Sequence, residues 1–279
     1  MLTPGYRHAE RIDIGPRLEF GQSWRDNTSV ATQSIATKTG FKAALIAFIA
    51  AFGMIASAQQ STPRELGLKY VRDSSEYATL ARQTYRVASD AVPRLVSGLA
   101  GRQWAVVLDV DETVLDNSTY QLERAAYGLP FDAASWSAWV QRREASAVPG
   151  AIDFIIVVRK LGGQVAWITN RATSDAGATR ENLKSARLWS EDDRLCTQDH
   201  EKHTKRTRRA EVVAGTGACA WAGKPTMIVA LVGDQMGDFP DTDEPIRDAG
   251  TDSAFGRTFF MLPNPMYGAW TTRVTRDAR

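Results

Sequence analysis

The chain has 279 residues, of which 43% are hydrophobic and 24% are charged, and its formal net charge is +2. This composition is ordinary for a globular protein, and the length suffices for one large domain or two small ones. The near-neutral charge argues against a strong overall attraction to acidic membranes or to nucleic acid, so we expect no nucleic-acid polymer as a partner.

Residues 1–58 form an N-terminal extension that ends in a predicted signal peptide. Lys42 precedes an uncharged apolar run over residues 43–56, and the small residues Ala56-Ser57-Ala58 close it. A basic flank, a short apolar core and a small-residue site are typical of a secretory signal, and the run is shorter than the roughly 20 residues of a membrane span. We expect cleavage near Ala58, a periplasmic or secreted location and no stable membrane anchor. A buried core helix is the alternative.

Residues 59–279 are predicted to hold the folded domain, which begins with a helix over residues 63–98. Pro93 is expected to end or kink this helix. The next apolar run, from Trp104 to Leu108, is rich in β-branched residues and predicts a strand that is buried on both faces.

Residues 117–150 carry five aromatic side chains without a clear period, and we interpret them as an insertion that covers the end of the first strand. Beyond it, apolar patterns predict helices over residues 151–161, 177–188 and 205–214, and strands over residues 164–168, 226–232 and 259–262. Strands that alternate with helices predict an α/β fold with a central, mainly parallel sheet.

Three of the predicted strands end in polar residues, namely Asp109, Thr169 and Asp234. Because ligands of such sheets bind at the carboxyl ends of the strands, we expect these residues to meet in one crevice. Asp109 and Asp111 alternate just past the first strand, so both carboxylates can face this crevice. Taken alone, such a pair would indicate only an acidic turn that caps a helix.

The acidic residues suit phosphate-ester chemistry. A carboxylate can attack phosphorus once its repulsion with phosphate is relieved, and a second carboxylate can protonate the leaving alkoxide and then deprotonate water. Asp234 and Asp238, which also follow a strand, add oxygen ligands of the kind that Mg²⁺ prefers. The metal would screen and polarise the phosphate.

Thr169 and Lys205 add a hydroxyl, a backbone N–H and a positive charge that can stabilise phosphoryl oxygens. Lys205 lies in a basic run from Lys202 to Arg209. Such a run is also typical of a solvated helix face, and its sequence alone does not distinguish Lys205 from its neighbours.

The chain has two cysteines, Cys196 and Cys219. Export to an oxidising compartment would permit them to pair. The sequence leaves open whether they form a disulfide or remain free thiols.

These motifs belong to longer stretches of sequence that follow one another in a recognisable order. They run from Val106 to Ser118, through Ile168 to Arg171 and Gly233 to Phe239, and end at Leu262 to Trp270. This series resembles the class C bacterial acid phosphatases, four-aspartate (DDDD) phosphohydrolases of the haloacid dehalogenase (HAD) superfamily, and covers residues from about 65 to 270. The resemblance implies a Rossmann-like core, flanked by helices, with a small α-helical cap around residues 117–150.

The resemblance also implies roles for the acidic residues. Asp109 would be the nucleophile that forms an aspartyl-phosphate, and Asp111 would be the general acid and base. The implied Mg²⁺ ligands are the side chains of Asp109, Asp234 and Asp238 and the backbone carbonyl of Asp111.

Phosphate binding is implied for Thr169, Asn170 and Lys205. The family register selects Lys205 from the basic run. Trp136 and Tyr267 fall where related enzymes hold an aromatic leaving group, such as a nucleotide base, between two rings. Ordinary core packing is the alternative for both aromatic residues.

The implied activity is magnesium-dependent hydrolysis of small phosphate monoesters, including nucleoside monophosphates. A phosphotransferase on the same scaffold would share the aspartyl-phosphate and differ only in its acceptor. A non-catalytic binding or storage protein would be expected to have lost its nucleophile, whereas Asp109 is present. Many relatives are lipoproteins, but no cysteine directly follows the predicted signal of this chain, because Cys196 and Cys219 lie far beyond it.

Overall fold

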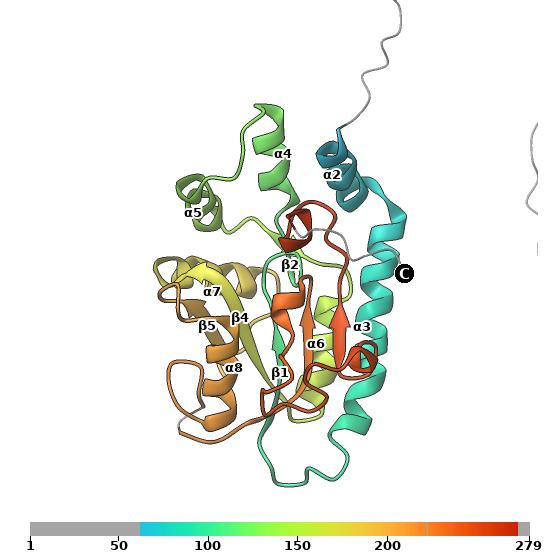
Figure 1. Cartoon of the computed structure of the whole chain (residues 1–279), viewed down its shortest axis with the longest axis vertical. Coiled ribbons are helices and arrows are strands. Elements are labelled where there is room, and N and C mark those ends of the chain that lie inside the picture. The colour runs from blue at the N-terminus through green and yellow to red at the C-terminus, as the bar shows by residue number, and fades with distance from the viewer. Residues whose placement is uncertain (1–61, 222, 273–279) are drawn as a thin grey trace, which may run out of the picture. The chain divides into compact units, whose positions relative to one another are not determined.

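The centre of the fold is a five-stranded sheet in the order β5-β4-β1-β6-β7, in which every neighbouring pair of strands is parallel (Figure 1). The structure is a computed structural model and describes residues 62–221 and 223–272. The strands are β1 (Trp104–Leu108), β4 (Gln164–Ala172), β5 (Arg194–Gln198), β6 (Met227–Gly233) and β7 (Phe259–Met261). The predicted α/β fold with a mainly parallel sheet is confirmed.

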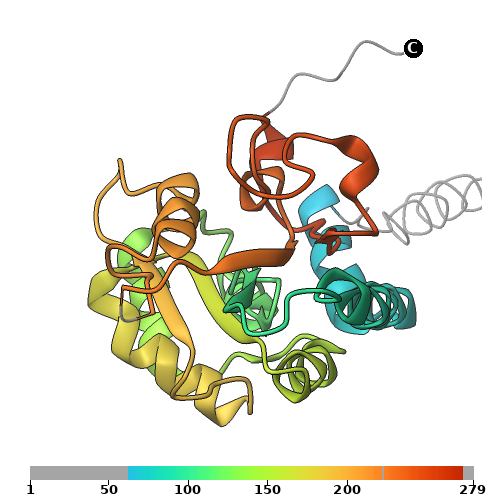
Figure 2. The same cartoon turned by 90° about the horizontal axis from the view of Figure 1, so that it is seen from below.

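Helices cover both faces of this sheet (Figure 2). Alternate residues of β1 point to opposite faces: Val106 and Leu108 pack in one apolar core, and Ala105 and Val107 pack in the other. The first core includes side chains of α3 (Ser75–Leu95), α6 (Ala151–Lys160) and α7 (Ala176–Ser185), and the second includes Val212 of α8 (Lys205–Ala214). The strand β1 is therefore buried on both faces, as its sequence predicts.

The single helix predicted over residues 63–98 is wrong, because the structure has two helices, α2 (Pro63–Asp73) and α3. Ser74 has extended backbone angles, φ −91° and ψ 138°, and its hydroxyl accepts the N–H of Tyr77 at 3.0 Å. A serine in this position caps a new helix rather than continuing the old one. Pro93 lies in the last turn of α3, which ends two residues later.

The segment expected as an insertion contains α4 (Ser118–Ala126) and α5 (Ala133–Arg142). Two short antiparallel strands, β2 (Leu115–Asp116) and β3 (Ser146–Ala147), bring the ends of the segment together. Both helices lie at the carboxyl end of the sheet, on the side where α2 also lies (Figure 1).

Two features of the sheet differ from the sequence predictions. The edge strand β5 was not predicted, and β4 continues to Ala172 instead of ending at Ile168. The additional residues of β4 remain in the sheet because Ala172 of β4 pairs with Gln198 of β5. A disulfide joins Cys196 of β5 to Cys219, with their Cα atoms 5.4 Å apart.

No helix within the described residues is long and apolar enough to span a membrane. The predicted extension and signal peptide over residues 1–58 lie outside the residues that the structure describes.

Candidate active site

A cavity of about 450 Å³ opens at the carboxyl ends of the central strands. It brings together side chains from the loop after β1, from β4, from the start of α8 and from α5. Of the predicted site residues, those that line it are Asp109, Asp111, Trp136, Asn170, Lys205 and Tyr267. The topology therefore collects predicted site residues that are up to 158 positions apart in the sequence, from Asp109 to Tyr267.

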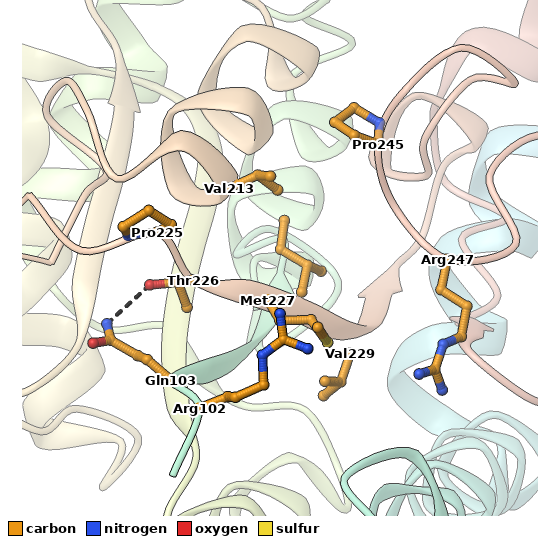
Figure 3. A pocket seen from close by; sticks show the side chains of 10 residues that line it. Arg102, Gln103, Val213, Pro225, Thr226, Met227, Val229, Pro245 and Arg247 are labelled. Atoms are coloured by element: carbon orange, nitrogen blue, oxygen red, sulfur yellow. Dashed lines mark hydrogen bonds between the residues drawn. The ribbon is translucent and has the colours of Figure 1, made fainter. Parts of the chain in front are cut away.

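A second cavity, of about 480 Å³, lies at the opposite ends of β1 and β6 (Figure 3). Among the residues that the structure describes, Arg102 and Arg247 are the charged residues of its lining, which includes no acid, histidine or cysteine. The hydroxyl of Thr226 is already bonded to the Gln103 amide at 2.9 Å. This cavity lacks a general base and an activated nucleophile, so we place the chemistry at the first cavity.

Three buried aspartates, Asp109, Asp234 and Asp238, form a cluster beside the first cavity. One carboxylate oxygen from each lies within 4.8 Å of the others. The second oxygen of Asp238 accepts the backbone N–H groups of Asp234 at 3.1 Å and of Gln235 at 2.9 Å. A Cβ atom at Gly233 would collide with the Asp238 side chain, which explains why glycine ends β6.

Lys205 inserts a positive charge into this cluster from the first residue of α8. Its Nζ lies 2.5 Å from a carboxylate oxygen of Asp109 and 2.5 Å from one of Asp238. Burial opposes the charged ammonium, but the two carboxylates outweigh burial and raise the pKa of Lys205 above its ordinary value. Lys205 is therefore a fixed cation between two strand ends.

Burial also shifts the pKa values of the acids in the cluster. It raises the pKa of Asp109 well above the ordinary value, against the attraction of Lys205 and with further repulsion from Asp238 and Asp234. Burial and the charge of Asp238 raise the pKa of Asp234 to about 6. One lysine does not balance three carboxylates, and the donor set consists entirely of oxygen atoms. The cluster therefore fits a hard divalent cation.

Asp111 lies outside the cluster of three and forms a different set of contacts. The buried guanidinium of Arg171 donates to one oxygen of Asp111 from Nε at 3.0 Å and from Nη2 at 2.7 Å. The amide nitrogen of Asn117 donates to the same oxygen at 2.9 Å. The structure thus separates Asp109, which faces Lys205, from Asp111, which faces Arg171.

Thr169 and Asn170 take different positions at the end of β4. Thr169 is fully buried, is absent from the lining of the cavity, and accepts the N–H of Arg171 on its hydroxyl at 3.1 Å. Asn170 is exposed and lines the cavity. Arg208 of α8 donates to the Thr169 carbonyl and, at 2.7 Å, to the Asn170 side chain. The role of these residues in phosphate binding stays a prediction.

The basic run is only in part a solvated helix face, because Lys202 and Arg206 are exposed but other members are not. Arg208 and Arg209 are buried, and Arg209 forms two hydrogen bonds with Glu244, at 2.8 and 2.7 Å. Arg209 also donates to the backbone carbonyl of Asp238 at 3.1 Å. Members of the run therefore tie α8 to the strand ends on both sides of Lys205.

The aromatic residues Trp136 and Tyr267 both line the first cavity and are both half-buried. The Trp136 ring packs edge-on against Tyr120, with ring centroids 5.1 Å apart, and the Arg171 guanidinium lies 5.6 Å from its centroid. The Trp136 ring is therefore partly used in packing, and the rest of its surface can meet a ligand.

Residues that contact the predicted site but were given no role from the sequence include Thr113, Asn117, Arg171 and Asn264. Asn264 donates to Asp234 at 2.8 Å. Arg171 and Asn264 both lie in stretches that carry the family resemblance, so the sequence marks them as candidates. It does not show which partner residues they contact. Those partners are 30 to 60 positions away in the sequence.

The parallel sheet, with its buried aspartates and lysine at the strand ends, is that of a HAD-type protein. Within this class, the family described as HAD superfamily, subfamily IIIB (acid phosphatase), matches residues 29–270, and the chain belongs to this family. The resemblance to the HAD acid phosphatases seen in the sequence is confirmed.

Curated relatives include two plant proteins. The chain is 30% identical over 166 residues to Acid phosphatase 1 of Solanum lycopersicum and 27% identical over 168 residues to the Stem 31 kDa glycoprotein of Glycine max. Each match covers 58% of this chain and 57% or 58% of the relative. The chain thus matches under two thirds of the length of these relatives.

Solved structures extend the comparison. The class C acid phosphatase from Bacillus anthracis, with tungstate bound, superimposes with a TM-score of 0.62 at 29% sequence identity. The superposition covers 74% of this chain and 86% of that chain. A second structure of the class C acid phosphatase from Bacillus anthracis gives the same values.

Proposed function

We propose that this protein hydrolyses small phosphate monoesters with the help of Mg²⁺. The observation that carries the proposal is the buried cluster of Asp109, Asp234 and Asp238, whose carboxylate oxygens lie within 4.8 Å of one another, with Lys205 between two of them. Membership in the acid phosphatase family supports the same reaction.

The side chains of Asp109, Asp234 and Asp238 and the backbone carbonyl of Asp111 would hold the cation. When bound, the cation screens the phosphate from these carboxylates and polarises its P–O bonds. Mg²⁺ suits such oxygen ligands and commonly keeps part of its hydration shell.

In the first step, an Asp109 oxygen forms a bond to phosphorus while the ester P–O bond breaks, and Asp111 gives its proton to the leaving alkoxide. In the second step, water attacks the phosphorus of the aspartyl-phosphate and gives a proton to Asp111, which releases phosphate and restores Asp109. Lys205, Thr169 and Asn170 are proposed to bind phosphoryl oxygens, and Lys205 offsets their growing charge.

Trp136 and Tyr267 are proposed to hold an aromatic leaving group, which would include nucleoside monophosphates among the substrates. Their shared position in the lining of the cavity supports this assignment. Aromatic side chains stack on any base, so this contact favours bases as a class over aliphatic groups.

We also propose that the mature protein is periplasmic or secreted and begins after Ala58. The predicted signal peptide and the disulfide between Cys196 and Cys219 support export, because disulfides persist in oxidising compartments. N-terminal sequencing of protein recovered from outside the cytoplasm tests this proposal, and an intact Met1 there would contradict it.

Turnover of p-nitrophenyl phosphate by the purified protein tests the activity. We expect turnover with Mg²⁺, loss of turnover after treatment with EDTA, and recovery when Mg²⁺ is added back. Absence of turnover above a metal-free control, across acidic and neutral pH, would contradict the proposal.

A further inference from the structure

Asn117, which precedes α4, is buried between Asp111 and Trp139. Its amide nitrogen donates to Asp111 at 2.9 Å and to the Leu115 carbonyl at 3.2 Å. Its amide oxygen accepts the indole N–H of Trp139 at 2.8 Å and an N–H of Arg171 at 3.3 Å. Both donor hydrogens and both acceptor positions of this side chain are therefore used inside the protein.

The chemistry of these partners fixes which way the Asn117 amide faces. An indole N–H and a guanidinium can only donate, so both must meet the amide oxygen. A carboxylate and a backbone carbonyl accept, so both must meet the amide nitrogen. A flipped amide would set its oxygen against Asp111 and its nitrogen against two donors, which leaves four hydrogen bonds unmade.

The same contacts connect Asp111 to the helix that carries Trp136. Trp139 lies on α5, three residues after Trp136, and is buried. Ser137 and Gln141 of α5 each donate to Asp175 at 2.8 Å, and Asp175 lies just beyond β4. The backbone N–H of Asn117 donates to Glu112 at 2.9 Å, which holds the loop between β1 and α4 in place.

We propose that Trp139 and Asn117 are positioning residues for Asp111. The indole N–H of Trp139 fixes the Asn117 amide, and Asn117 together with Arg171 holds the Asp111 carboxylate where it can give its proton to the ester oxygen. The proposal rests on the proposed function of Asp111 as the general acid. Asn117 and Trp139 are both absent from the lining of the cavity, so they would act through Asp111 and not on the substrate.

The test is the effect of Trp139→Phe on two substrates that differ in the acidity of the leaving group. Phenyl phosphate and p-nitrophenyl phosphate carry the same ring, but phenol is a much weaker acid and needs protonation far more than p-nitrophenol does. The kcat/KM value reports the transfer of phosphate to Asp109 and is not affected by the later hydrolysis step. We expect Trp139→Phe to lower kcat/KM for phenyl phosphate by roughly 10-fold more than for p-nitrophenyl phosphate.

Two further variants make the result specific. Trp189→Phe removes an indole whose N–H is bonded to Glu191 at 3.3 Å, and it should leave the ratio of the two kcat/KM values unchanged. Asn117→Asp keeps the size of the side chain but sets an oxygen against Asp111, so it should show the same selective loss on phenyl phosphate. Circular dichroism checks that each variant folds, and Asn117→Asp decides the question if Trp139→Phe does not fold.

Equal losses on both substrates in Trp139→Phe and Asn117→Asp would overturn the proposal, because a packing defect lowers both rates alike. Asp111→Asn separates this failure from failure of the proposed function. If Asp111→Asn also shows no selective loss on phenyl phosphate, the role of Asp111 as general acid is wrong. If Asp111→Asn shows the selective loss and the other two variants do not, only the positioning role is wrong.

Discussion

At the scale of single residues, Lys205 shows how one side chain of a basic run acquires a separate role. It is the first residue of α8, and its Nζ lies 2.5 Å from both Asp109 and Asp238. Its neighbour Arg206 points outward to the exposed Asp243 at 2.6 Å. A difference of one position on the helix thus separates a cation held between two buried carboxylates from a surface ion pair.

We expect Lys205→Met to lower kcat by roughly 100-fold or more, because it removes the charge that would stabilise phosphoryl oxygens. Arg206→Met is the matched control, since an exposed ion pair contributes only about 0–1 kcal/mol, and it should keep the wild-type kcat. Steady-state kinetics with p-nitrophenyl phosphate measures both. A folded Lys205→Met variant with wild-type kcat would remove Lys205 from the site.

Trp136 gives a second prediction at this scale, on substrate preference. Stacking on an aromatic side chain contributes about 1–3 kcal/mol per base. Trp136→Ala should therefore lower kcat/KM for a nucleoside monophosphate by roughly 5- to 150-fold, and lower it much less for a small aliphatic phosphate. Equal losses on the two substrates would show that Trp136 serves only in packing.

The part of the candidate site that could be predicted from the sequence consists of polar residues that directly follow a predicted strand. Asp109 and Asp234 follow buried strands, and the parallel sheet brings them together. The contacts of Asn117 and Arg171 with Asp111 could not be predicted in this way. They join residues 6 and 60 positions from Asp111, and only the folded chain sets such distances.

At the scale of elements, some segments have the predicted bounds and others do not, and each difference has a local cause. The strand over Trp104–Leu108 and the helix over Lys205–Ala214 have the predicted bounds. The edge strand β5 gave a weak signal because Arg194 and Leu195 are only half-buried. The break at Ser74 was missed because apolar spacing continues on both sides, and only the cap marks the end of α2.

The Ser74 cap predicts a change in stability without a change in catalysis. Ser74→Ala removes the hydroxyl that accepts the Tyr77 N–H, which should lower the free energy of unfolding by about 1 kcal/mol. Ser75→Ala, one position along and exposed, should change it far less. Urea denaturation measures both, and equal effects would contradict the capping role.

At the scale of the whole molecule, the acidic cluster links metal binding to the stability of the fold. It places three buried carboxylates beside a single lysine, so folding concentrates negative charge that a cation would neutralise. A ligand that binds only the native state stabilises it by about 2.7 kcal/mol at 100 times its Kd.

We therefore expect Mg²⁺ in such excess to raise Tm by about 5–10 °C in the purified protein. EDTA should reverse the rise, and Asp238→Asn should reduce it, because the variant removes one proposed ligand. Thermal unfolding measures these shifts without any turnover. An equal rise in the wild type and in Asp238→Asn would place the metal elsewhere.

The most direct measurement of the central claim is chemical trapping of Asp109. The protein is mixed with excess substrate and Mg²⁺, quenched in acid and reduced with borohydride, which converts an aspartyl-phosphate to homoserine. Peptide mass spectrometry then locates the reduced residue. We predict homoserine at Asp109 in the wild type and none in Asp109→Asn, which should also lack turnover. Homoserine at another aspartate, or continued turnover by Asp109→Asn, would contradict the role of Asp109 as nucleophile.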